Sequence, residues 1–395
     1  MVERSHRDTV RRNRRDYNGQ CSPSHSSRRG LYRSLCRRVA IFGRASGRHF
    51  AAICAVSAAA ITALAAVPTA YASPNTAYGS SSQASFAQAK DAYDAGDKKL
   101  ALAYGKTAAQ NGDTEAQVLV GHILMRGETG VVDYVSAASW FKKAALKDHP
   151  DALVALAEMS LRSQGGLTPS QAVPWLERAA ALGRKDAMRV LADVYDNGQG
   201  VAKDSVKARQ WRGKAANDGD ALAARAMGDE LLESDAFEAL QWYEHAAALG
   251  DPQSAYIAAI MYVENYEIRP NSKKSATLMQ QAANANIPAA MADYGLLVFQ
   301  GNGVEQNSAA AAKWFERAAK AGDSEGQFLY AFTLAKGDGV DQSYEDAYFW
   351  LLRSGESGID EYDADRKDLR ERLEDNVDAA VLARARTRFN RTNTP

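Results

Sequence analysis

Tryptophan recurs at a nearly fixed interval along most of this chain. Successive tryptophans stand 35, 36, 31, 72 and 36 residues apart, and 72 is twice 36. Leu278 stands where the double interval needs another anchor, and Tyr104 lies 36 residues before the first tryptophan. The six tryptophans are Trp140, Trp175, Trp211, Trp242, Trp314 and Trp350. A period of this length is typical of stacked structural repeats, and it predicts eight units between residues 85 and 356.

The sequence around each anchor predicts two antiparallel helices per unit. An aromatic pair is followed by Ala-Ala and usually by Gly-Asp, as in residues 239–251 and 312–323. Small and apolar residues recur at helical spacing, as at Ala116, Val120 and Leu124, which predicts one buried face per helix. Four aspartates are expected N-caps of first helices: Asp113, Asp220, Asp251 and Asp323.

The turn within a unit is marked by Gly-x-Gly-Val at residues 198–201, 301–304 and 337–340. Glycine supplies the positive φ angles that a tight helix–helix turn needs. The unit between Trp211 and Trp242 is five residues shorter, and its turn at 233–235 has no glycine. We therefore expect a shorter hairpin in that unit.

These recurring residues closely resemble the Sel1-like repeat family, a relative of the tetratricopeptide repeat, over about 270 residues. The resemblance implies an all-α fold: a right-handed α-solenoid of about eight helix-turn-helix repeats over residues 85–356, which binds proteins on its concave side. It says almost nothing about activity, because fold alone does not specify function. Some extracellular members carry a disulfide in each unit, and this region has no cysteine.

After Trp350 the repeat pattern stops, and residues 357–395 are expected to cap the solenoid. Two polar helices are predicted, at residues 363–374 and 376–389. A partner-binding tail is the alternative. The expected buried residues of the cap are Leu369, Leu373, Val377, Val381, Leu382 and Phe389.

Residues 1–72 have the three parts of a secretory signal peptide. The first 50 residues contain 13 Lys and Arg against 3 Asp and Glu, and an uncharged, Ala-rich run follows from residue 50 to 67. Ala70-x-Ala72 is a small-x-small cleavage site, so we expect cleavage before Ser73 and a periplasmic or secreted protein. The alternative is an uncleaved segment that anchors the chain in the inner membrane.

The chain after that site is free of cysteine, because Cys21, Cys36 and Cys54 all precede it. Disulfides and zinc–thiolate sites are therefore excluded from the expected mature chain. Residues 73–84 are rich in Ser, Ala and Gly and predict a flexible linker. Residues 73–395 carry 35 basic against 45 acidic side chains, and this acidic balance argues against nucleic-acid binding.

No motif in the sequence predicts catalysis, a cofactor or a metal. His122, His149 and His245 do not pair at helical spacing, and HExxH is absent. Lys106 stands in a Gly-Lys-Thr triplet, but Leu100 occupies the place of the first glycine of a phosphate loop. The sequence therefore favours a non-enzymatic protein.

One position of the first helix, just after the Leu-Gly pair, is the candidate binding site. It is occupied by His122 in the unit anchored by Trp140 and then, in successive units, by Glu158, Asp193, Asp229, Ile260, Leu296 and Phe332. By helical projection this position points away from the core, so stacking predicts a groove with an acidic half and an apolar half. Such a groove suits a basic, amphipathic segment of a partner protein. An ordinary solvated helix face is the alternative for the acidic residues.

The favoured function is a periplasmic scaffold or adaptor that binds another protein, in a setting such as envelope signalling or exopolysaccharide assembly. The alternative is a protein that binds peptidoglycan or exopolysaccharide. Its expected aromatic platforms are Tyr262, Tyr266, Tyr294 and Phe332.

Overall fold

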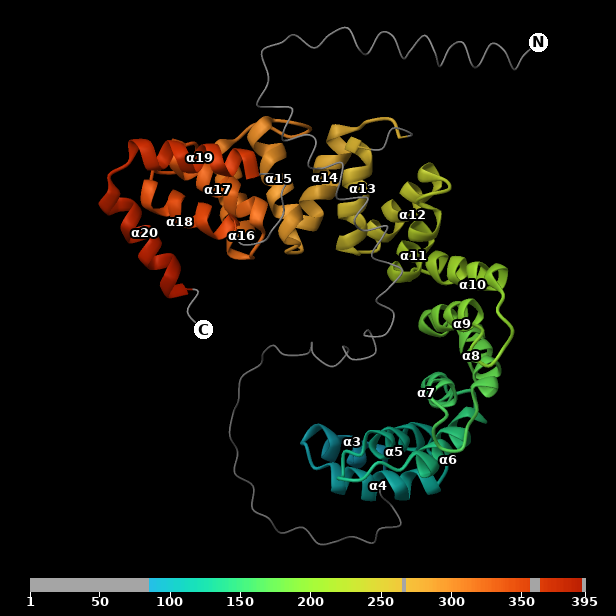
Figure 1. Cartoon of the computed structure of the whole chain (residues 1–395). Helices are drawn as coiled ribbons and strands as arrows, with labels where there is room; N and C mark the ends of the chain where they lie inside the picture. Colours follow the sequence, from blue (N-terminus) through green and yellow to red (C-terminus); the bar gives the residue numbers. More distant parts are fainter. Residues whose placement is uncertain (1–84, 265–267, 356–362, 393–395) are drawn as a thin grey trace, which may run out of the picture. The chain divides into compact units, whose positions relative to one another are not determined.

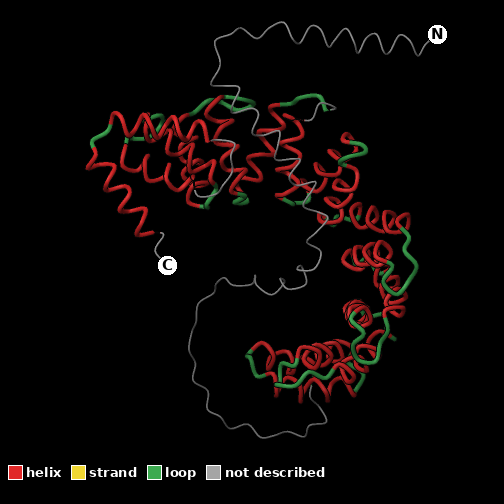
Figure 2. The backbone as a smooth tube through the Cα atoms, viewed as in Figure 1, coloured by secondary structure: helices red, strands yellow, loops and turns green. Residues whose placement is uncertain are grey.

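The computed structural model describes residues 85–264, 268–355 and 363–392, and these ranges contain helices and no strand (Figure 2). The predicted all-α fold is thereby confirmed. The expected signal peptide and linker, residues 1–84, and the start of the expected cap, residues 357–362, lie outside the described residues. None of the described helices is both long and apolar enough to span a bilayer.

The helices fall into two compact units that divide in the first turn of α13, between Ala255 and Tyr256 (Figure 1). The first unit contains α3 (Phe86–Asp94), α4 (Lys98–Gln110), α5 (Thr114–Arg126), α6 (Tyr134–Ala145), α7 (Pro150–Leu161), the 3₁₀ turn η2 (Pro169–Gln171), α8 (Ala172–Ala181), α9 (Lys185–Asn197), α10 (Ser205–Asn217), α11 (Ala221–Leu231) and α12 (Ala236–Ala248). The second contains most of α13 (Pro252–Glu264), α14 (Ser272–Asn284), α15 (Pro288–Gln300), α16 (Ser308–Lys320), α17 (Ser324–Lys336), α18 (Tyr344–Ser354), α19 (Asp363–Asn376) and α20 (Ala379–Thr392).

Within each unit, consecutive helices pack as antiparallel hairpins, and each hairpin packs on the next. The predicted N-caps are confirmed: the carboxylate of Asp113 accepts from the amide of Ala116 at 2.9 Å, and that of Asp323 accepts from Gly326 at 2.7 Å. Asp220 and Asp251 cap α11 and α13 in the same way. These bonds satisfy amides at a helix start that have no partner within the helix.

The predicted turns are also confirmed. α9 and α15 end at Gly198 and Gly301, whose φ angles of 66° and 70° lie in the left-handed region. The short unit turns without glycine between α11 and α12. There the carbonyl of Leu231 accepts hydrogen bonds from the amides of Ser234 and Asp235, at 3.0 and 2.8 Å.

The core anchor of most repeats is the residue after the tryptophan, or after Leu278 in the repeat that lacks a tryptophan, whereas the tryptophans themselves are half-buried. The residues at this anchor position with at most 1% exposure are Phe141, Leu176, Tyr243, Met279, Phe315 and Leu351. The tryptophans therefore lie at the edge of the core rather than inside it. In four repeats a basic side chain three residues later lies over the tryptophan ring, as where the ammonium of Lys143 lies 4.0 Å from the Trp140 ring centroid.

Size complementarity governs how the two helices of a repeat meet. Gly121, Gly228 and Gly295 of the first helices face the buried anchor rings Phe141, Tyr243 and Phe315 of the second helices. A Cβ at Gly295 would lie 2.7 Å from Cε1 of Phe315, so no larger residue fits without movement. The other four repeats between residues 114 and 359 have alanine at the glycine position and a non-aromatic residue at the anchor position. Those pairs are Ala157 with Leu176, Ala192 with Arg212, Ala259 with Met279, and Ala331 with Leu351.

The C-terminal helices cover the last repeat, with α20 beside α18 (Figure 1). Arg384 donates to Glu345 at 2.7 Å, Arg388 pairs with Asp346 at 2.5 Å, and Arg386 donates to the hydroxyl of Tyr348 at 2.7 Å. Of the six residues expected to be buried, Leu373 and Leu382 are, with 4% and 5% exposure. The remaining four are half-buried: Leu369, Val377, Val381 and Phe389.

Candidate functional site

The acidic half of the predicted groove is exposed in the first compact unit. Glu158, Asp193 and Asp229 stand at equivalent positions of α7, α9 and α11, and all three side chains are exposed. Each helix presents the residue because its opposite face carries the small and apolar residues of the core. The structure thus places three carboxylates on three successive first helices.

The prediction that three apolar side chains face the groove is wrong for two of them. Ile260 on α13 and Leu296 on α15 are only 3% and 7% exposed, so they belong to the core. Phe332 on α17 is half-buried. α15 packs against both α16 and α17, so neighbouring helices cover a side chain that the projection of one helix assigns to solvent.

A row of arginines, which the sequence reasoning missed, lies one turn before the acidic row. Arg189 and Arg225 precede Asp193 and Asp229 by four residues on α9 and α11. Arg189 donates to the Asp220 carboxylate at 3.3 Å, and Arg225 donates to that of Asp251, also at 3.3 Å. Each of these carboxylates is the N-cap of the next first helix, so the arginines join adjacent repeats. The exposed face is therefore of mixed charge rather than uniformly acidic.

Within the acidic row, Glu158 and Asp193 make no side-chain hydrogen bond or ion pair with any described residue. Asp193 is exposed, but the protein around it displaces part of its hydration shell. This desolvation raises the pKa of Asp193, and Arg212 and Arg189 offset the rise only in part. An accessible carboxylate that is only partly stabilised by nearby positive charge is suited to pair with a basic side chain of a partner.

Asp229 differs because it already has a partner inside the protein. Its Oδ1 accepts a hydrogen bond of 2.7 Å from the hydroxyl of the buried Tyr243. Desolvation raises the pKa of Asp229, while the Tyr243 hydroxyl and Arg225 oppose that rise. Asp229 therefore binds a core tyrosine and is also one of the three exposed carboxylates of the acidic row.

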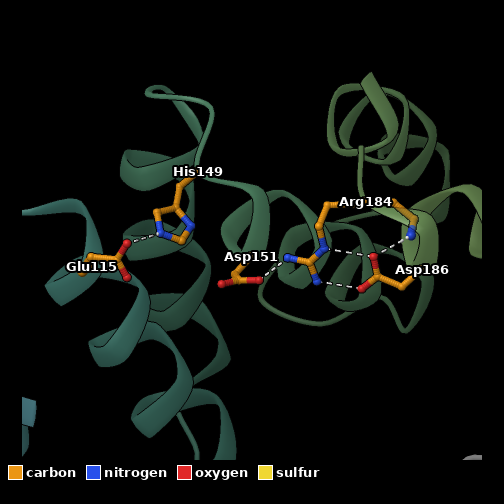
Figure 3. A network of polar contacts seen from close by, with 6 residues as sticks. Glu115, His149, Asp151, Arg184 and Asp186 are labelled. Atoms are coloured by element: carbon orange, nitrogen blue, oxygen red, sulfur yellow. Dashed lines mark hydrogen bonds and ion pairs between the residues drawn. The ribbon is translucent and has the colours of Figure 1, made fainter. Parts of the chain in front are cut away.

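A polar network joins the N-terminal ends of α5, α7 and α9 (Figure 3). Nε2 of His149 lies 3.1 Å from Oε1 of Glu115 in the preceding repeat. Arg184 donates to Asp186 at 2.7 Å and also pairs with Asp151 of the preceding repeat. His149 and Arg184 occupy the N-cap positions that aspartate fills on other first helices. Neither side chain makes a capping hydrogen bond, and each instead contacts an acidic residue of the preceding first helix.

The aromatic platforms expected for a glycan are mostly in the core. Tyr262 and Tyr294 are 7% and 5% exposed, so they offer no open ring face. Tyr266 lies outside the described residues. Phe332 remains, and it lines a pocket with Leu296, Phe299 and Phe315. Within the described ranges, no group of three or more His, Cys, Asp or Glu could hold a metal ion.

Comparison with known families gives a consistent match along the repeats. The model of the Sel1 repeat matches seven consecutive segments, at residues 114–149, 150–183, 185–220, 221–251, 252–287, 288–323 and 324–359. The α3–α4 hairpin precedes the first match, so it is an eighth hairpin of divergent sequence.

Individual relatives are distant. The chitin synthase regulator SKT5 of Saccharomyces cerevisiae is 27% identical over 238 residues, which is 54% of this chain and 34% of that protein. The chain thus spans about a third of the length of this curated relative. A Sel1 repeat protein from Oxalobacter formigenes is 25% identical in sequence, with a TM-score of 0.46, over 57% of this chain and 94% of that one. A protective antigen of uropathogenic Escherichia coli is 23% identical, with a TM-score of 0.41, over 75% of this chain and 72% of that one.

Proposed function

Because the chain belongs to the Sel1 repeat family, we propose that it is an adaptor that binds another protein through the exposed face of α7, α9 and α11. Sel1 repeat proteins generally mediate protein–protein interaction, and their scaffold is generally non-catalytic. The partner of this chain contributes basic side chains, which meet the acidic row of Glu158, Asp193 and Asp229.

The observation that carries this proposal is the contrast between neighbouring carboxylates. Glu115, Asp151 and Asp186 all pair with basic groups of the protein itself. Glu158 and Asp193 have no such ion pair among the described residues, although they lie on the same helices as Asp151 and Asp186. A lysine or arginine from a partner would supply the missing charge and reverse part of the desolvation cost at Asp193.

The test is charge reversal on this face. Glu158→Lys combined with Asp193→Lys should slow association and weaken affinity for the natural partner by roughly tenfold or more, because the repulsion acts before contact. Added salt should lower the affinity of the wild-type complex toward that of the double variant. The partner is identified first, by photo-crosslinking from positions 158 and 193 followed by mass spectrometry.

A matched control is available in the same repeats. Glu177 on α8 and Asp218 after α10 are also exposed carboxylates without an ion pair among the described residues. Glu177→Lys with Asp218→Lys makes the same change in net charge and should leave affinity unchanged. If both double variants weaken binding equally, the effect is one of net charge, and the proposed face is wrong.

We also propose that the chain is exported and acts in the periplasm or outside the cell, with envelope assembly or signalling as the setting. The support is the basic region, the uncharged run and the Ala70-x-Ala72 site. The mass of the mature protein from fractionated cells tests this: a chain that begins at Ser73 in the periplasmic fraction is expected. A full-length chain in the membrane fraction would instead establish the anchored alternative.

A further inference from the structure

The second compact unit contains a pocket of about 510 Å³ between α15, α16 and α17. Its apolar lining comes from Leu296, Phe299, Phe315, Leu329 and Phe332. Its polar lining comes from Gln300, Asn302, Gln306 and Thr333. The volume is within the usual range of small-ligand sites.

A small side chain on α17 contributes to the pocket. Thr333 occupies the position that larger apolar residues fill on four other first helices: Ile123, Met159, Met261 and Leu297. Lost volume in a repeat array reduces packing against the neighbour, so an unfilled pocket costs stability. A hollow kept at that cost is a candidate for a function.

None of the ten lining residues is titratable. The amide of Gln300 makes no side-chain hydrogen bond with any described residue. Gln306 donates through Nε2 to the carbonyl of Phe299 at 2.9 Å, which leaves its Oε1 as an acceptor. Thr333 donates to the carbonyl of Tyr330 at 2.8 Å, which leaves lone pairs on its hydroxyl oxygen. The pocket therefore offers neutral donors and acceptors beside aromatic rings.

We propose that this pocket binds an uncharged saccharide. A sugar ring has apolar C–H faces, which suit the rings of Phe299 and Phe332, and hydroxyl groups, which suit amides that both donate and accept. A purely apolar ligand would desolvate these amides without replacing their hydrogen bonds. A cationic ligand would find no carboxylate in the lining and would approach Lys336, whose ammonium lies 4.4 Å from the Phe332 ring centroid.

The test uses the full chain and a panel of defined oligosaccharides, measured by calorimetry and ligand-observed NMR. The neutral probes are tetramers of β-1,4-linked glucose, β-1,4-linked N-acetylglucosamine and α-1,4-linked glucose. Tetragalacturonate tests whether Lys336 instead recruits an anion, and an uncharged peptide with a central leucine tests an apolar side chain. We expect saturable binding of at least one neutral tetramer.

Two variants connect such binding to the pocket. Thr333→Leu fills the hollow with an apolar side chain, so it should weaken binding by about tenfold or more while the protein stays folded. Gln300→Ala removes an exposed amide and should weaken binding by roughly fivefold, the effect of one hydrogen bond. Thr277→Leu is the matched control, because Thr277 lies on α14, outside the lining, and likewise donates to a helical carbonyl.

The inference is overturned if no neutral tetramer binds, or if binding survives Thr333→Leu in a protein with wild-type circular dichroism. Preferential binding of tetragalacturonate or of the peptide also contradicts it, because the ligand would then be of another class. The acidic row on α7, α9 and α11 is unchanged in these variants. Failure here therefore leaves the proposed protein-binding function intact, and success does not depend on it.

Discussion

Adding one methyl group at Gly295 should destabilise this protein, although the same change normally stabilises a helix. Glycine within a helix costs about 1 kcal/mol relative to alanine. In Gly295→Ala, however, the new Cβ would lie 2.7 and 2.8 Å from two carbons of the Phe315 ring and 3.1 Å from Cβ of Trp314. Overpacking of this kind costs about 1–3 kcal/mol, and here the ring is almost fully buried. We expect a net loss of up to about 2 kcal/mol after the gain in helix propensity.

The compensating change is already present in a neighbouring repeat. Residues 324–359 pair Ala331 with Leu351, so Gly295→Ala combined with Phe315→Leu reproduces a combination that this chain tolerates. Phe315→Leu alone should cost about 1–2 kcal/mol through the cavity it leaves. The double variant should be more stable than the sum of the single changes predicts, by about 1–3 kcal/mol.

Urea denaturation followed by circular dichroism measures the free energy of unfolding of each variant. Hydrogen exchange of the amides in α15 and α16 shows whether the loss of stability occurs in this repeat. Gly213→Ala is the control, because a Cβ at Gly213 on α10 meets no other atom within 4 Å. It should stabilise the protein by about 1 kcal/mol. The reasoning fails if Gly295→Ala stabilises as Gly213→Ala does, or if the effects at positions 295 and 315 simply add.

Three further outcomes follow from the charged groups. Desolvation raises the pKa of Asp193 above its ordinary 3.8, so the charged form of this side chain destabilises the folded protein above that raised pKa. Asp193→Asn should therefore be more stable than the wild type by a few tenths of a kcal/mol at neutral pH, and this difference should disappear in acid. Equal stability across that pH range would exclude the desolvation. Burial, with a smaller effect from Arg126, lowers the pKa of His122 below 6.5, so the unfolded chain takes up a proton first and stability falls as pH drops through 6.5. His122→Gln should remove this part of the decline between about pH 7.5 and about pH 5.5 in urea titrations, and an unchanged decline would contradict the assignment. Arg184→Met should cost about 1 kcal/mol, because it breaks contacts to Asp151 and Asp186 while keeping most of the apolar stem, and the loss should shrink in high salt. A loss that salt does not reduce would point to packing instead.

The hairpins and their caps could be predicted because each depends on residues close together in the sequence. Asp113 needs only the amide three residues later, and the short turn at 233–235 follows from a missing Gly-x-Gly. The regular interval then multiplies one local prediction along the chain. This is why the repeat architecture could be inferred without knowledge of any long-range contact.

The face of a helix was harder to predict, because a projection describes one helix in isolation. The projection assigns Ile260 and Leu296 to solvent, and both are nevertheless buried. The ion pairs of Arg189 and Arg225 are made with the following repeat, so they appear only when equivalent positions of adjacent units are compared. The pocket at Thr333 likewise depends on the neighbouring repeat, because the hairpin of α15 and α16 supplies most of its lining.

The match between glycine and ring has a consequence for how such a chain can evolve. Repeat proteins lengthen and shorten by recombination between similar stretches of DNA. A crossover between units would keep every matched pair, whereas a crossover within a unit could join the first helix of one repeat to the second helix of another. Joining α15 to α18 would place Gly295 opposite Leu351 and leave a void, and joining α17 to α16 would force Ala331 against Phe315. Selection should therefore retain breakpoints between hairpins, which makes the whole hairpin the heritable unit of this array.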